Sequence, residues 1–278
     1  MAKNNNLHKA KKIKDDEFYT MSTDIEKEIS QYKDYFKGKK VFLNCDDPIK
    51  SAFWEYFSKN FDHLGLKKLT STHYKKDEQT YKLELTSYED EPMLIPLLGN
   101  GDFRNQESID ILKDSDVVVT NPPFSLMGEF IEQLEQYDKD FLIIAPLTAV
   151  SRNTVFEHFK KGEWKFGHSR INYFNRPDGS KKEVRCHWLT NIKDIKKPEH
   201  MMYMRYEGNE NKYEFYDNTN VLHIERDNLI PLDYEGEMGV SIAFMTKINM
   251  EQFEITRKLT VKLNGKNMFS RIGIKHKK

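Results

Sequence analysis

Short apolar runs alternate with amphipathic segments through the first 160 residues of the chain. Three runs, at 41–43, 117–119 and 141–145, have the length and the composition of buried strands. Apolar side chains also recur every three or four positions, the period of a helix with one buried face, at 25–36, 52–61, 107–113, 130–134 and 155–159. Further strands are predicted at 66–74, 81–85 and 93–98. This order of strands and helices predicts a doubly wound α/β sheet.

The pattern becomes β-rich after about residue 164. Two such segments, 164–174 and 183–189, flank the turn residues of 176–179, and from about residue 205 the sequence is irregular and aromatic. Near the end, the alternation at 259–263 and the Asn264-Gly265 turn are followed by a second apolar stretch. These features predict a β-hairpin.

Charge is segregated along the chain, although its total is zero. Residues 1–14 and 257–278 hold 13 of the 44 Lys and Arg residues and none of the 44 acidic residues, so the rest of the chain has a net charge of −13. Basic segments of this kind bind phosphates or solvate the chain ends. We expect a basic arm at 1–14, an α/β domain at 15–200 and a β-rich region at 201–278.

Composition excludes several classes of protein. The longest apolar run, 141–146, is too short to cross a membrane, and the start of the chain has no apolar signal segment. Cys45 and Cys186 lie far apart without a CxxC pair, which excludes a disulfide framework and a cysteine-based zinc site. We therefore expect an unexported, cytoplasmic protein without a metal.

Asn121-Pro122-Pro123-Phe124 directly follows a predicted central strand. Open α/β sheets bind their ligands at this edge. An exocyclic amine is a poor nucleophile while its lone pair is delocalised into the ring, and two oxygen acceptors can hold it in a reactive geometry. The Asn121 side chain and the Pro122 carbonyl supply two such acceptors, and the prolines stiffen the loop. Phe124 can stack on a base, although the four residues also suit an ordinary turn.

Asn-Pro-Pro-Phe after such a strand resembles the catalytic motif of amino methyltransferases that use S-adenosylmethionine. Asp16-Glu17-Phe18-Tyr19-Thr20 resembles the methionine-binding motif that these enzymes place before their first strand. The acidic turn at 44–48, Gly101-Asp102-Phe103-Arg104 and the segment 239–253 resemble the EcoRI-type adenine-specific DNA methyltransferase family. The wider group of methyltransferases carries a glycine-rich turn where this chain has the acidic one. The resemblance covers about 14–274.

This resemblance implies a Rossmann-like methyltransferase sheet and a function. It implies site-specific methyl transfer from S-adenosylmethionine to the N6 amine of a flipped adenine in duplex DNA, with S-adenosylhomocysteine as product. The catalytic domain would be 15–200, and 201–278 would recognise the target. Double-stranded DNA is the implied partner, a cognate restriction endonuclease would act separately, and we expect a monomer because one catalytic unit suffices for one strand.

Roles in cofactor binding follow from the same resemblance. The implied residues are Phe18, Tyr19, Thr20, Asn44, Asp46, Asp47, Asp102, Phe103 and Asn121. Asp46 or Asp47 can pair with the cationic amine of the cofactor, and either can instead cap the next helix. Asp102 would accept from the cofactor adenine with Phe103 against its face, or would be a plain turn residue. The second strand ends in Thr-Ser-Thr-His at 70–73, so no acid there is assigned to the ribose.

The β-rich segments supply candidates for base and DNA contacts. Tyr173 or Phe174 is expected on the face of the flipped base opposite Phe124, and core packing is the alternative. The expected DNA contacts are Arg170, Arg176, Lys181, Lys182, Arg257, Lys258, Lys262, Lys266 and Arg271. Two other functions stay open: an amino methyltransferase acting on RNA or protein glutamine, and a non-catalytic DNA-binding subunit with a methyltransferase-like fold.

Overall fold

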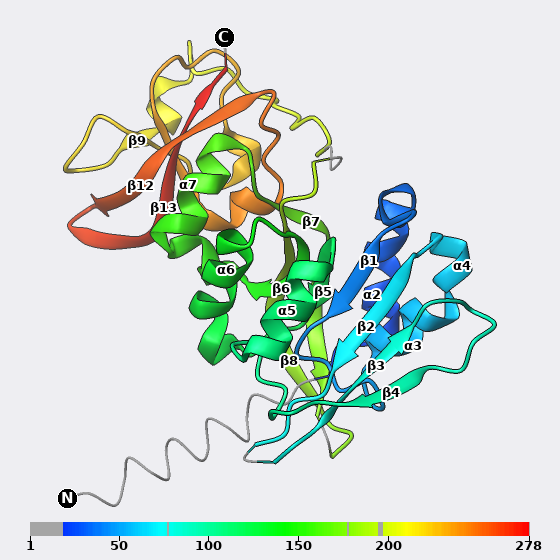
Figure 1. Cartoon of the computed structure of the whole chain (residues 1–278). Helices are drawn as coiled ribbons and strands as arrows, with labels where there is room; N and C mark the ends of the chain where they lie inside the picture. The colour runs from blue at the N-terminus through cyan, green and yellow to red at the C-terminus, as the bar shows by residue number, and fades with distance from the viewer. Residues whose placement is uncertain (1–18, 77, 177, 194–196, 278) are drawn as a thin grey trace, which may run out of the picture. The chain divides into compact units, whose positions relative to one another are not determined.

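The computed structural model describes residues 19–76, 78–176, 178–193 and 197–277 (Figure 1). Its contacts divide the chain into two compact units. Among the described residues, unit 1 contains those up to Pro146 together with those of Gly167–Ile192, and unit 2 contains Leu147–Phe166 and those from Lys193 onward. No helix among the described residues is long and apolar enough to cross a membrane.

Unit 1 is built on an eight-stranded sheet of order β4-β3-β2-β1-β5-β6-β8-β7. Its four central strands are parallel: β2 (Lys68–Thr72), β1 (Lys40–Leu43), β5 (Val117–Thr120) and β6 (Asp140–Pro146). The outer strands are β3 (Tyr81–Leu85), β4 (Met93–Pro96), β7 (Lys165–Asn175) and β8 (Lys181–Thr190). Val41 pairs with both Leu69 and Val117, so β1, β2 and β5 end at the same edge of the sheet.

Helices pack on both faces of this sheet, as the alternating pattern predicts. They are α2 (Ser22–Ile29), η1 (Ser30–Phe36), α3 (Ala52–Lys59), α4 (Phe61–Leu64), α5 (Gln106–Asp114), η2 (Phe124–Leu126) and α6 (Met127–Gln136). The helices α5 and α6 lie on one face, and α2 and α3 lie on the other (Figure 1). Fully buried Phe42, Phe53, Phe130 and Trp188 show that apolar burial holds the layers together. The doubly wound α/β prediction is confirmed.

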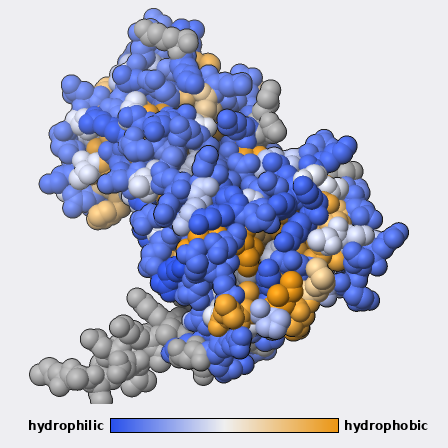
Figure 2. All heavy atoms as spheres, in the orientation of Figure 1, coloured by the Kyte–Doolittle hydropathy of each residue, from blue (hydrophilic) through white to orange (hydrophobic). Residues whose placement is uncertain are grey.

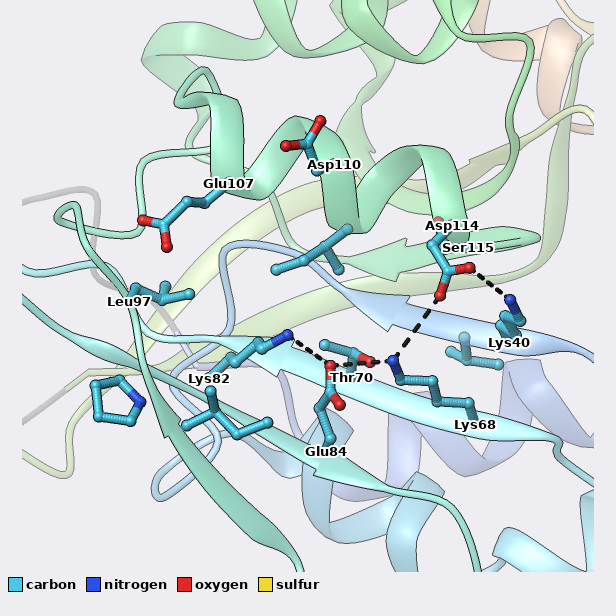
Figure 3. Close-up of a pocket in the computed structure, with 14 residues that line it drawn as sticks. Lys40, Lys68, Thr70, Lys82, Glu84, Leu97, Glu107, Asp110, Asp114 and Ser115 are labelled. Atoms are coloured by element: carbon cyan, nitrogen blue, oxygen red, sulfur yellow. Dashed lines mark hydrogen bonds and ion pairs between the residues drawn. The ribbon is translucent and has the colours of Figure 1, made fainter.

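The chain reaches β4 from β2 through two antiparallel pairings, without a crossover helix. A groove of about 400 Å³ therefore lies between α5 and strands β1 to β4 (Figure 3). Ion pairs line it: Lys68 contacts Glu84 at 3.0 Å, and Lys40 contacts Asp114 at 2.5 Å. The edge strand β4 leaves Leu94 58% exposed, and apolar side chains gather over this side of an otherwise hydrophilic surface (Figure 2).

Unit 2 carries a second sheet, of order β12-β13-β11-β10-β9. The strands are β9 (Glu214–Phe215), β10 (Leu222–His223), β11 (Met238–Ser241), β12 (Phe253–Leu263) and β13 (Lys266–His276). The unit's helices are η3 (Leu147–Ser151), α7 (Asn153–Lys161), η4 (Glu210–Lys212), η5 (Asp227–Leu229) and η6 (Ile242–Thr246). The predicted C-terminal hairpin is confirmed, because β12 and β13 pair antiparallel around Asn264-Gly265.

The structural units do not follow the expected boundary at residue 200. Leu147–Phe166 belongs with the C-terminal part, because α7 packs its buried Phe156 and Phe159 inside unit 2 and contacts β12. The sequence pattern of a strand followed by a helix does not reveal which core the helix joins. The roles assigned to the parts stay predictions, and the arm at 1–14 lies outside the described residues.

A buried carboxylate joins α2 to β7. Glu28 is 0% exposed and accepts four hydrogen bonds, from Tyr32 Oη at 2.8 Å, His168 N at 2.8 Å, and both Ser169 N and Ser169 Oγ at 2.6 Å. A Cβ on Gly167 would come within 2.0 Å of Glu28 Oε1, so only glycine allows this approach. The strand that carries Tyr173 and Phe174 is fixed by this carboxylate.

We expect Glu28→Gln to lower the free energy of unfolding by about 1–3 kcal/mol, because the amide NH2 would face donors and leave at least one unsatisfied. Urea unfolding measures this. Glu26→Gln, at an exposed position of the same helix, is the matched control and should change little. Equal stability of Glu28→Gln and wild type would contradict the assigned role.

Candidate active site

The turn after β1 has an unusual backbone. Asn44 is 1% exposed, and Cys45 adopts a φ of 69°, a left-handed conformation that residues with a Cβ rarely take. In the wider methyltransferase pattern this turn is glycine-rich. The left-handed residue turns the chain sharply, so that Asp46 and Asp47 follow directly at the carboxyl edge of the sheet.

Asp46 ties the ends of three strands together. Its Oδ2 lies 2.5 Å from Thr120 Oγ1 at the end of β5, and its Oδ1 accepts from Ser51 Oγ at 3.1 Å. The backbone N–H of Asn121 also bonds to this carboxyl group. Ser71 Oγ, from β2, donates to the Asp46 carbonyl at 2.7 Å. The Asn121 motif is thereby anchored to the acidic turn.

The Thr120 hydroxyl lies between two oxygen acceptors of the acidic turn. Thr120 Oγ1 has one proton but lies within hydrogen-bond distance of both Asn44 O and Asp46 Oδ2. The single hydroxyl proton of Thr120 is shared between Asn44 O and Asp46 Oδ2, and both of these oxygens accept. Burial raises the pKa of Asp46 to about 7, against the lowering effect of its hydrogen bonds.

Asp47 is the more open of the two acids. Its side chain is 18% exposed, and its Oδ1 accepts from Ile49 N at 3.1 Å. Tyr81 Oη lies 3.5 Å from the same oxygen, and His73 Nε2 lies 3.8 Å from Oδ2. The helix α3 is capped by Ser51, whose Oγ accepts from Phe53 N, so neither acid caps it. Asp47 is therefore the more accessible carboxylate, although Lys50 Nζ also lies 3.9 Å from its Oδ2, whereas Asp46 is enclosed by the fold.

The loop that carries Asp102 lies against the end of β2. Gly101 has a φ of 75°, and a Cβ there would come within 2.0 Å of His73 O. Asp102 is bound by Arg104 through Nη2 at 2.7 Å and Nε at 2.9 Å, and these bonds lower the pKa of Asp102. Burial and the charges of Asp46 and Asp102 raise the pKa of the Cys45 thiol. The structure therefore brings the Asp102 loop close to the acidic turn.

Phe103 does not present an open ring. It is 3% exposed and packs edge to face on Phe130, with the ring centroids 5.1 Å apart. Gln133 Nε2 donates to the Phe103 carbonyl at 2.9 Å. The expected stacking of Phe103 on the cofactor adenine stays a prediction, and its ring is part of the α6 packing here.

Asn121 to Phe124 form the connection from β5 to α6. Pro122 is buried, and Pro123 has an extended ψ of 121° immediately before η2 begins at Phe124. Pro123 O accepts from Leu126 N at 3.0 Å. The two prolines thus separate the strand from the helix and fix Phe124 at the helix start.

Phe124 lies beside one of the two candidate aromatic residues of β7. Its ring centroid is 6.1 Å from that of Phe174, at an interplanar angle of 51°. Phe174 is 0% exposed, whereas Tyr173 is 44% exposed. Phe174 therefore supports Phe124 from the core, and Tyr173 has the accessible ring.

The N-terminal motif reaches the same strand. Tyr19 and Asn175 exchange two backbone hydrogen bonds of 2.9 Å each, so the motif lies beside the end of β7. Thr20 is 5% exposed, and its Oγ1 is buried without a hydrogen-bond partner among the described residues. Phe18 lies outside the described residues. Long sequence separation concealed this contact between the motif and β7.

The expected DNA-contacting residues divide between the two units. Four belong to the β7–β8 hairpin of unit 1, whose chain reverses where Arg176 N donates to Ser180 O at 2.8 Å: Arg170, Arg176, Lys181 and Lys182. Five belong to the β12–β13 hairpin of unit 2: Arg257, Lys258, Lys262, Lys266 and Arg271.

Three cations of the β12–β13 hairpin are already engaged. Arg257 Nη2 lies 2.7 Å from Glu237, Lys258 Nζ lies 3.0 Å from Ser151 O, and Arg271 Nη1 lies 3.1 Å from Ile224 O. Lys262 and Lys266 are exposed and have no side-chain hydrogen bond or ion pair with the described part of the chain. These two lysines are the hairpin cations best placed for phosphate.

Sequence reasoning missed the hydroxyl groups that organise the site. Thr120 and Ser51 hold the Asp46 carboxyl group, and His73 and Tyr81 surround Asp47. A usable signal was present for Thr120, a polar residue that ends an otherwise apolar strand. Within the described residues, no group of three or more His, Cys, Asp or Glu side chains forms a potential metal site.

Comparison with known proteins gives consistent results. The sequence model of one family, described as "Adenine-specific methyltransferase EcoRI", matches residues 6–278. The chain belongs to this family. A relative from Escherichia coli, "Type II methyltransferase M.EcoRI", is 39% identical over 319 residues, covering 100% of this chain and 98% of the relative. No solved structure matches the chain.

Two mycoplasma relatives agree with this assignment. "Type II methyltransferase M.MpnI" of Mycoplasma pneumoniae is 37% identical over 90% of this chain and 84% of its own length. "Type II methyltransferase M.MgeORF184P" of Mycoplasma genitalium is 33% identical over the same shares. The predicted family, fold and DNA adenine methyltransferase activity are confirmed. Family membership implies S-adenosylmethionine use in general and a DNA substrate.

The raised pKa of Asp46 predicts a pH dependence of stability. Because the folded pKa of about 7 lies above the ordinary 3.8, the folded state binds more protons than the unfolded state between these values. The contribution of Asp46 to the free energy of unfolding therefore falls as pH rises from about 4 to 7, by at most about 1.4 kcal/mol per pH unit. Asp46→Asn should remove this slope, because the amide does not titrate in this pH range.

Denaturant unfolding at pH 5, 6, 7 and 8 tests this expectation. Asp62→Asn, at an exposed carboxyl group of the same unit, is the control and should keep the wild-type slope. A slope that is the same in Asp46→Asn and wild type would show that Asp46 is not the titrating group.

Proposed function

We propose that this DNA adenine methyltransferase transfers the methyl group of S-adenosylmethionine to N6 of an adenine extruded from the duplex, with Asn121 and Pro122 holding the amine. The observation that supports this most is the position of the motif. It follows a central strand, its Asn121 N–H bonds to the Asp46 carboxyl group, and its Phe124 is backed by Phe174. Each constraint fixes the loop before substrate binds.

Methyl transfer to an exocyclic amine depends more on hydrogen-bond acceptors for the amine than on a strong base. The Asn121 side-chain oxygen and the Pro122 carbonyl would accept the two amine hydrogens and turn the nitrogen lone pair toward the methyl group. A bond from N6 to the methyl carbon forms as the bond from sulfur to that carbon breaks. One amine proton is then lost to solvent. Pre-positioned acceptors stabilise the positive charge that develops on nitrogen in the transition state.

The cofactor would lie along the carboxyl edge of the sheet, where it would supply an activated methyl group. Asp47 is the better candidate for the cationic amine, because Asp46 is buried and bonded to Thr120 and Ser51. Asn44 Nδ2 is buried without a hydrogen-bond partner among the described residues, as is Thr20 Oγ1. Such orphaned polar atoms fit a polar ligand.

Base binding would use the aromatic residues beside the motif. Stacking of the adenine on Phe124 is worth about 1–3 kcal/mol, which offsets much of the few kcal/mol needed for extrusion. Tyr173, with its exposed ring, is the better candidate for a second contact, because Phe174 is enclosed. The duplex would be held by the cations of both hairpins.

Substrate class is tested by offering labelled S-adenosylmethionine with unmethylated duplex DNA, RNA and protein in parallel, followed by nucleoside analysis. Label in N6-methyladenine of DNA supports the proposal, and label only in RNA or protein contradicts it. A monomer in the cytoplasm, acting separately from any cognate endonuclease, remains our expectation.

Asn121→Ala should lower turnover on DNA by about 100-fold or more, the scale of losing one pre-positioned hydrogen bond in an active site. Affinities for DNA and cofactor should change little. Single-turnover methylation and filter binding measure the two effects. The control, Asn228→Ala at an exposed position of unit 2, should behave as wild type. Full turnover by Asn121→Ala would exclude the acceptor role.

Lys262→Ala/Lys266→Ala should weaken binding to all duplexes and reduce the slope of log K against log salt by about 1.8, since each phosphate contact contributes about 0.9. Point variants are preferable to deleting 257–278, which would remove the buried Ile272 and Ile274 of β13. Lys160→Ala/Lys161→Ala, on the exposed end of α7, is the control. An unchanged slope would assign the hairpin lysines to solvation alone.

A further inference from the structure

An aromatic side chain protrudes from the basic hairpin. Phe269, on β13, is 82% exposed, the highest exposure among the large apolar residues of unit 2. The hairpin ends in a tight turn in which Asn264 has a φ of 50° and Gly265 a φ of 75°. Two consecutive positive φ values match the right-handed twist of the strands and hold the hairpin in one register.

A β-bulge directs Phe269 away from the core. Leu259 pairs with Arg271 and Val261 pairs with Met268, so two residues of β13 oppose the single residue between Leu259 and Val261. Those two residues are Phe269 and Ser270, and Ser270 has a φ of 54°, which is unusual for a residue with a side chain. Bulges commonly re-aim a side chain at a functional surface.

The opposite face of the hairpin already packs in the core. Leu259 and Val261 form a buried cluster with Tyr216 and Val221, and Met268 packs against the same cluster. Successive residues of a strand alternate between faces, so Phe269 lies on the face opposite to Met268. The inner face of the hairpin is therefore already buried in unit 2, whereas Phe269 on the other face is not covered by apolar side chains of this unit.

The surroundings of Phe269 favour a polyanionic partner. Lys262 pairs with Asn267, two residues before Phe269, so both strands present these residues on the face of Phe269. Lys262 is exposed and forms no side-chain hydrogen bond or ion pair within the described part of the chain. Lys266 is exposed too, but it pairs with Leu263 beside the turn and lies on the face of Met268. An apolar protein partner would desolvate these charges without pairing them, whereas duplex DNA offers phosphates for the lysines and stacked bases for the ring.

We propose that Phe269 is an apolar wedge that inserts into the base stack of duplex DNA while Lys262, on the same face, holds a flanking phosphate and Lys266 contributes positive charge at the turn. Insertion of such a side chain unstacks a base step and bends or unwinds the duplex. The inference rests on the proposed function and deepens it, because it assigns a second base-contacting residue to the unit that does not carry Asn121. Base extrusion is easier from a duplex that is already unstacked.

Three variants of the full chain separate the wedge from the charges. Phe269→Ala should weaken duplex binding about 5- to 150-fold, the range of aromatic stacking on bases, with no change in the salt slope because no charge is removed. Phe269→Trp should restore affinity. Lys262→Ala/Lys266→Ala should show the opposite signature, a reduced slope. Tyr203→Ala removes another exposed aromatic side chain of unit 2, 74% exposed, and should bind as wild type.

Unwinding is measured with a closed-circular plasmid that topoisomerase relaxes while the protein is bound. The linking number is read after the protein has been removed. At equal occupancy, wild type and Phe269→Trp should shift the linking number, and Phe269→Ala should shift it less. Equal affinity and equal unwinding by wild type and Phe269→Ala would overturn the wedge. The wedge would also be overturned if Tyr203→Ala lost as much duplex affinity as Phe269→Ala. The same holds if Phe269→Ala changed only the self-association of the protein.

The methyl-transfer assay keeps the two ideas apart. If the wild-type protein methylates DNA and Phe269→Ala changes neither duplex affinity nor unwinding, the wedge is refuted and the proposed function stands. Duplex binding and unwinding that depend on Phe269, together with label only in RNA or protein, refute the proposed function and leave the wedge standing.

Discussion

The buried Asp46 carboxyl group is the contact on which the organisation of unit 1 depends. It joins the turn after β1 to Thr120 at the end of β5 and to Ser51 at the start of α3, while its carbonyl accepts from Ser71 of β2. Parallel strands that end at one edge leave backbone groups without partners there. The Asp46 carboxyl group accepts from the Thr120 and Ser51 hydroxyls and from the Asn121 N–H, so it supplies acceptors for groups of three segments at this junction.

Because of this constraint, the adjacent acids Asp46 and Asp47 have different surroundings. Asp46 is committed to the fold, and Asp47 stays accessible between His73 and Tyr81. The turn that carries these acids bends sharply at Cys45, whose φ of 69° is left-handed. The Asn121 loop is held at the same junction, because the Asn121 N–H bonds to the same Asp46 carboxyl group. A change in the turn should therefore also alter the Asn121 loop.

Periodicity predicted the central strands and helices well, because 117–119 and 141–145 are apolar enough to be buried only at the centre of a parallel sheet. The family motif placed Asn121 at the end of a strand, as the structure has it. Packing partners could not be predicted in this way: Leu147–Phe166 joins the C-terminal unit, and Phe174 supports Phe124. Such contacts depend on three-dimensional packing between distant segments. Likewise, the exposure of Phe269 depends on a one-residue register shift that alternation does not show.

A crystal structure of the chain with a duplex substrate and a non-reactive analogue of S-adenosylmethionine would test the central claim most directly. The account predicts an extruded adenine whose N6 lies about 3 Å from both Asn121 Oδ1 and Pro122 O, with Phe124 against its ring. An adenine that stays stacked in the duplex, or an N6 held by other groups, would contradict it.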